Sequence, residues 1–98
     1  MRLADIATAR AGDKGDDSII LVVADADLAA VTAALTPARV AAHMGLPAAS
    51  VTVRVHHHLG AVTVICQGRL DGGVTRSRTA DPHGKTLSAH LLELVVAD

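Results

Sequence analysis

The sequence predicts an α+β fold in which helices pack on a β-sheet, and three observations lead to this prediction. Apolar and polar residues alternate along Ser50–His58, as in a strand with one buried face. Residues 18–24 are apolar at both parities, which is typical of a central strand covered on both sides. Thr36-Pro37 and Asp81-Pro82 each place a capping residue before a proline, which favours the start of a helix.

The first half of the chain is expected to contain two strands followed by helices. Arg2–Ala9 is predicted to form an additional N-terminal strand, and residues 18–24 the central strand. Two short helices, or one bent helix, are expected within residues 26–44, with Asp25 or Asp27 as the first cap. The inward face of the first helix has a spacing of three and four residues and consists of Leu28, Val31 and Leu35.

The second half is expected to begin with a hairpin. Ser50–His58 and Ala61–Gln67 are its strands, and Leu59-Gly60 makes the tight connection. A turn at residues 71–73 and a further strand at Val74–Thr79 are predicted after it.

The predicted order ends with a helix and a short strand. The helix opens at Asp81-Pro82 and runs to about Leu91. Leu92–Ala97 can continue this helix or form an edge strand, and the adjacent valines favour the strand. From Ser18 onward the order is β, α, β, β, α, β, which is the ferredoxin-like sandwich, here with an extra N-terminal strand. Residues 1–98 are predicted to form this single domain.

The composition excludes several classes of partner and cofactor. Nine basic and ten acidic side chains leave a net charge of −1, and there is no Phe, Tyr or Trp, so neither nucleic acid nor an anionic membrane is an expected partner. The lone cysteine, Cys66, cannot hold an iron–sulfur cluster and is expected to be a small buried hydrophobe. No signal peptide is apparent, and the apolar run Ile19–Ala24 is too short to span a bilayer, so a cytoplasmic protein is expected.

Chemically versatile residues gather in one segment, Ala9–Ser18, which reads A-R-A-G-D-K-G-D-D-S. Gly12 and Gly15 are expected to let the backbone bend tightly and direct its amides toward one point. Lys14 would add a positive charge there, with Arg10 and Ser18 at the flanks of the segment. The segment therefore predicts an anion-binding loop, although it lacks the spacing of a Walker phosphate-binding loop.

The carboxylates of the same segment allow a catalytic role. Asp13 and Asp16 could transfer a proton while Lys14 stabilises negative charge. Because Lys14 lies among carboxylates, it should hold its own proton firmly, which suits binding better than base catalysis. The alternative is an ordinary turn in which Asp13 and Asp16 bond their own backbone and the lysine is solvated.

Other basic and histidine residues are weaker candidates. Arg76 and Lys85 could contact an anion, or they could be a solvated strand face and the first turn of a capped helix. His56 and His58 would share one strand face and could grip a metal only with a third ligand from elsewhere, such as His43, His83 or His90. No metal or other cofactor is expected, and surface imidazoles are the favoured interpretation of residues 56–58.

Several short motifs together resemble those of a known family. The chain is similar to the AtuA-like ferredoxin-fold domain from about Leu3 to Val96, and the Gly12–Asp16 motif is the most specific mark. Ser18 stands where an asparagine is common in the pattern. The remaining motifs are Leu35-Thr36, Arg39-Val40, Gly72-Gly73, Asp81 and Gly84-Lys85-Thr86 ahead of Leu91-Leu92.

The resemblance implies a role in the bacterial breakdown of acyclic terpenes and related branched or CoA-linked acids. Because the chain lacks the large domain of the fused members, it resembles a small subunit or accessory domain. Its expected partners are then a larger AtuA-type protein or a second copy of itself, together with a small acidic or CoA-linked ligand. A stand-alone acid–base enzyme and a purely structural interaction module are the alternatives.

Overall fold

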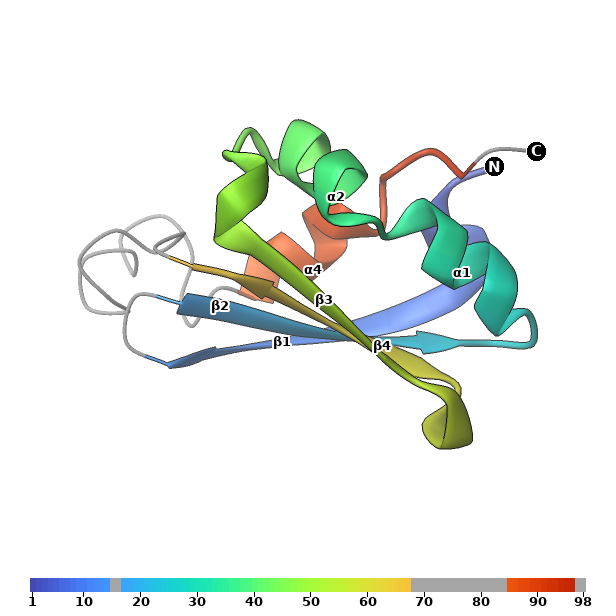
Figure 1. Cartoon of the computed structure of the whole chain (residues 1–98). Helices are drawn as coiled ribbons and strands as arrows, with labels where there is room; N and C mark the ends of the chain where they lie inside the picture. The colour runs from blue at the N-terminus through green and yellow to red at the C-terminus, as the bar shows by residue number, and fades with distance from the viewer. Residues whose placement is uncertain (15–16, 68–84, 97–98) are drawn as a thin grey trace.

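The computed structural model describes residues 1–14, 17–67 and 85–96 (Figure 1). These residues form a four-stranded antiparallel sheet with the strand order β1-β2-β4-β3. The strands are β1 (Ala7–Lys14), β2 (Asp17–Ala24), β3 (Val51–His56) and β4 (Ala61–Cys66). The helices are α1 (Leu28–Ala34), α2 (Pro37–Met44) and α4 (Lys85–Leu91), with 3-10 turns η1 (Leu3–Asp5), η2 (Ala48–Ser50) and η3 (His57–Leu59).

The helices all lie on one face of the sheet, as Figure 1 shows. This is the predicted α+β, ferredoxin-like arrangement, with β1 as the extra N-terminal strand. Among the described residues, no helix is long and apolar enough to cross a membrane.

Strand β2 lies at the centre of the sheet and has two different faces. Ser18, Ile20 and Val22 are fully buried under the helices. Leu21 and Val23 point to the other face and are each 37% exposed. The prediction of a central strand covered on both sides is therefore wrong in this respect, because the described helices cover only one side.

The core between sheet and helices is aliphatic. Cys66 is buried within it, as predicted, and Val31 and Leu35 contribute the inward face of α1 while Leu28 is only partly buried. With no aromatic ring available, branched side chains fill this layer. Its fully buried hydrophobic members are Leu3, Ile20, Val22, Val31, Leu35, Val40, Val62, Val64, Cys66 and Leu91.

The predicted pair of short helices is confirmed, and local capping explains both of its start points. The Asp27 carboxylate accepts a hydrogen bond from the Ala30 amide at 3.1 Å and begins α1. The Thr36 hydroxyl accepts one from the Arg39 amide at 3.3 Å and begins α2, with proline at its first position. Gly45 ends α2 at φ +72°, in the left-handed region that favours glycine.

The N-terminal strand starts later than predicted. Residues 3–5 form η1 because the Asp5 carboxylate accepts a hydrogen bond from the Arg2 amide at 2.8 Å and closes a turn. The amides of Leu3 and Ala4 then bond to the carbonyls of Leu94 and Leu92. Strand β1 begins at Ala7 and extends to Lys14, five residues beyond the predicted end.

The expected last strand, Leu92–Ala97, is reduced to a single bridge between Arg2 and Val95. Strand β1 already occupies the edge position beside β2 in the sheet. Among the described residues, the terminal segment therefore forms no continuous pairing with a strand. The predicted turn at 71–73, the strand at Val74–Thr79 and the helix start at Asp81-Pro82 lie outside the described residues.

Candidate functional site

Strands β1 and β2 form a hairpin that contains most of the candidate segment. Gly12, Asp13 and Lys14 are strand residues paired with Ile19, Ser18 and Asp17. Only residues 15 and 16 separate the paired ends. The prediction of a tight bend that begins at Gly12 is therefore wrong, because the antiparallel ladder continues through this glycine.

Gly12 is not required by the local backbone or by local packing. Among the described glycines, Gly45 and Gly60 have positive φ and Gly12 does not. A Cβ built on Gly12 would meet no atom within 4 Å. A glycine inside a strand, where an alanine would fit, is typical of a position that a ligand or another backbone approaches closely.

One row of residues crosses the sheet beside the hairpin end: Asp13 on β1, Ser18 on β2 and Cys66 on β4. Ser18 is fully buried, and its Oγ has no hydrogen-bond partner in residues 1–14, 17–67 and 85–96. An unsatisfied buried hydroxyl costs about 1–3 kcal/mol, so a protein rarely retains one without a use. This hydroxyl lies on the helix-covered face, at the end of β2 next to the candidate segment.

Arg10 lies further along β1, opposite Leu21, and is exposed. Beside it, β1 and α4 enclose a hollow of about 320 Å³ lined by Ala9, Arg10, Ala11 and Ser88. No hydrogen bond or ion pair is given to the Arg10 guanidinium by the rest of the chain that the structure describes. The lining of this hollow consists mostly of small side chains, which leave room for a ligand.

A larger hollow lies at the opposite end of the sheet. It measures about 520 Å³ and is lined by Leu28, Ala29, Thr32, Ala33 and His57, from α1 and η3. It has no Arg or Lys in its lining, so it is poorly suited to an anion. The smaller hollow beside Arg10 is the better candidate despite its size.

The structure places the remaining predicted site residues only in part. Lys85 is the first residue of α4. Helix α4 packs against β1, which is one strand of the hairpin. Gly15, Asp16 and Arg76 lie outside the described residues, as do the side chains of Asp13, Lys14 and Lys85.

The histidine run does not lie on one strand face. His56 ends β3, and its Nε2 is 2.8 Å from the Thr63 Oγ1 on β4. His57 and His58 belong to η3, so the prediction that His56 and His58 share a strand face is wrong. The chain turns here because Gly60, at φ +60°, reverses it into β4. Among the described residues, no group of three or more His, Cys, Asp or Glu could hold a metal ion.

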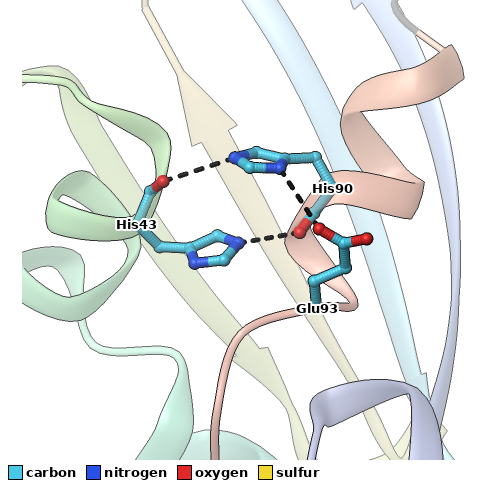
Figure 2. A network of polar contacts seen from close by, with 3 residues as sticks. All are labelled: His43, His90 and Glu93. Carbon is cyan, nitrogen blue, oxygen red and sulfur yellow. Dashed lines mark hydrogen bonds and ion pairs between the residues drawn. The ribbon is translucent and has the colours of Figure 1, made fainter.

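Sequence reasoning missed a reciprocal contact between two other histidines (Figure 2). His43 on α2 and His90 on α4 stack with ring centroids 4.5 Å apart. Each Nε2 bonds to the backbone carbonyl of the other residue, at 2.7 Å from His43 and 3.3 Å from His90. A carbonyl oxygen only accepts, so each ring carries its proton on Nε2. His90 Nδ1 also lies 3.8 Å from Glu93 Oε2.

This histidine pair joins the ends of two helices rather than forming a ligand site. Both rings stand in the last turn of their helices, a position that favours a basic group near free carbonyls. That position was the only signal in the sequence, since the two residues are 47 positions apart. The pair holds α2 against α4 on the covered side of the sheet.

Comparison with known proteins identifies one matching family. The family model described as the AtuA ferredoxin-like domain matches residues 1–97. Neither the curated proteins nor the solved structures include a significant match to the chain.

Proposed function

The chain belongs to the AtuA ferredoxin-like domain family, and we propose that it is a small subunit or accessory domain that binds an anionic ligand at the end of the β1–β2 hairpin. The ligand class is a small carboxylic acid or its CoA thioester. The partner is a larger AtuA-type protein, and the setting is the catabolism of acyclic terpenes or related branched acids.

The observation that carries this proposal is the unsatisfied hydroxyl of Ser18. It is fully buried, yet among the described residues no group accepts its proton or donates to its oxygen. A hydroxyl can donate to a carboxylate and regain the hydrogen bond that it lost on folding. Because it lies in the same row as Asp13, a ligand that reached it would also contact the hairpin.

Two further features of β1 lie near the hairpin but on the other face of the strand, because Gly12 pairs with Ile19 and Arg10 with Leu21. Gly12 leaves open space where any other residue would place a side chain. Arg10 is free of ion pairs in the described chain, but its side chain belongs to the face away from α4, so it lies outside the site proposed for the Ser18 hydroxyl.

Within this proposal, the hairpin residues have separate roles. Lys14 contributes a second positive charge, and Asp13 and Asp16 orient it or move a proton. Gly15 permits the connection, and Arg76 and Lys85 supply further positive charge from the later part of the chain. If the partner supplies the reacting groups, these residues act in binding alone.

Calorimetric titration with inorganic phosphate, 3-methylbutanoate and the CoA thioester of that acid tests the proposal. Lys14→Met should weaken binding of the preferred ligand roughly tenfold or more, because a charged hydrogen bond contributes about 1.5–3 kcal/mol. The matched control is Arg2→Met, which removes an equal charge next to η1 and should leave affinity unchanged. Equal affinity in both variants, or no binding of any of the three by the wild type, would favour the structural module instead.

A further inference from the structure

The sheet face opposite the helices carries an unpartnered apolar strip. The strand register places Ile19, Leu21 and Val23 of β2 beside Ile65, Thr63 and Ala61 of β4 on this face. Leu21 and Val23 are each 37% exposed, and no described helix lies on this side (Figure 1). Their neighbours on the same face of β1 and β3 are Thr8, Arg10, Gly12, Thr52, Arg54 and His56. We call these twelve residues together the open face.

The charge on the open face has one sign. Its central row runs Arg10, Leu21, Thr63, Arg54, so an arginine stands at each end of an uncharged middle. Both arginines are exposed, and no hydrogen bond or ion pair is given to either side chain by the described part of the chain. The three rows that make up the face contain no Asp or Glu, and the next row, at the hairpin end, pairs Lys14 with Asp17.

A second copy of the chain is a poor occupant of this face. A two-fold axis between two such faces would bring the arginines of one copy over those of the other, or over an uncharged row. The three rows offer these arginines no carboxylate, and like charges that face each other oppose association.

We propose that the open face docks a different protein chain, whose contact surface has an apolar centre bordered by carboxylates that pair with Arg10 and Arg54. The apolar residues of β2 and β4 supply the dry centre of the interface, and the arginines fix its orientation from the two sheet edges. The partner extends past the strand edges to reach the area that a stable complex needs. The proposed function requires a partner, and this inference assigns the surface that holds it.

In-cell photocrosslinking of the full chain tests the surface. A benzophenone amino acid replaces Thr52, exposed on the open face, or Ala42, exposed on α2. The Thr52 position should yield one adduct with a different protein, and its crosslinked peptide should contain Asp or Glu next to apolar residues. The Ala42 position should not yield that adduct.

Charge reversal separates docking from incidental proximity. Arg54→Glu should lower the Thr52 adduct about tenfold, since an interfacial charge pair is replaced by repulsion, whereas Arg2→Glu should leave it unchanged. Reversing the partner carboxylate to lysine should restore the adduct with Arg54→Glu. A 20 kDa adduct of two copies, the absence of an adduct, or an adduct insensitive to Arg54→Glu would each overturn the assignment. Arg54 lies on β3, away from the hairpin, so this result is independent of ligand binding by Lys14.

Discussion

Ser18 connects stability to function at the scale of a single residue. Its buried oxygen lacks a partner, so Ser18→Ala should raise the free energy of unfolding by about 1 kcal/mol. The same change should weaken ligand binding, because the hydroxyl that would donate to the ligand is gone. Urea unfolding followed by far-UV circular dichroism measures the first effect, and calorimetry the second.

Ser50 provides the matched control for this prediction. Its hydroxyl donates a hydrogen bond to the Pro47 carbonyl at 2.7 Å, so Ser50→Ala should lower stability by about 0.5–1.5 kcal/mol. If Ser18→Ala lowers stability to the same extent, the Ser18 hydroxyl is satisfied within the protein and no longer supports a ligand site.

The glycines differ in what they contribute to the fold. Gly12→Ala should leave stability unchanged or raise it by up to about 1 kcal/mol, because the strand conformation is ordinary and the space is open. Gly60→Ala should lower stability by about 1–2 kcal/mol, because φ is +60° in the left-handed region. Thermal unfolding of both variants checks this ranking.

A different result for Gly12 would change the interpretation of the hairpin. If Gly12→Ala were as destabilising as Gly60→Ala, the glycine would be structural. If it preserved stability but weakened ligand binding, the open space at Gly12 would be used by the ligand, as proposed.

At the scale of elements, the histidine pair is a polar link between α2 and α4. Each single variant removes the ring stacking and the hydrogen bond of its own Nε2, but it keeps the backbone carbonyl that accepts from the other ring. The stacking is therefore the contact that both variants lose. His43→Ala and His90→Ala should each destabilise the protein by about 1 kcal/mol, and the double variant should lose less than the sum of the two. Urea unfolding of the three variants gives this coupling energy; strictly additive losses would mean that the rings do not act as a pair.

Element boundaries could be predicted from the sequence where local contacts determine them. Thr36 and Pro37 begin α2 through contacts within one turn, and Gly45 ends it, so the prediction was correct there. Arg2–Ala9 was predicted wrongly because Asp5 closes a turn and the backbone of residues 3 and 4 bonds to residues far along the chain.

The candidate site was predictable in its residue types more than in its geometry. Gly12 suggested a bend because glycine can adopt positive φ. Glycine can also adopt ordinary strand angles, and here the strand pairing continues through it. Ser18 was identified from its position beside the motif, whereas its complete burial is a result of tertiary packing that no local pattern indicates. The His43–His90 contact has no local signature, since it depends on how two helices meet.

At the scale of the whole molecule, the two faces of the sheet differ in composition and in proposed role. The covered face contains the aliphatic core, with the unsatisfied Ser18 at the hairpin end. The open face presents an apolar strip between Arg10 and Arg54. A ligand at the hairpin and a partner on the open face would therefore meet at β1, which contributes to both.

The central claim is that an anion binds at the end of the β1–β2 hairpin, and amide chemical-shift mapping tests it most directly. Titration of ¹⁵N-labelled protein with the tightest-binding of the three ligands should shift the amides of residues 10–14, 17 and 18, and Lys14→Met should abolish these shifts. Shifts confined to the α1–η3 hollow, or no saturable shift in the hairpin, would contradict the account.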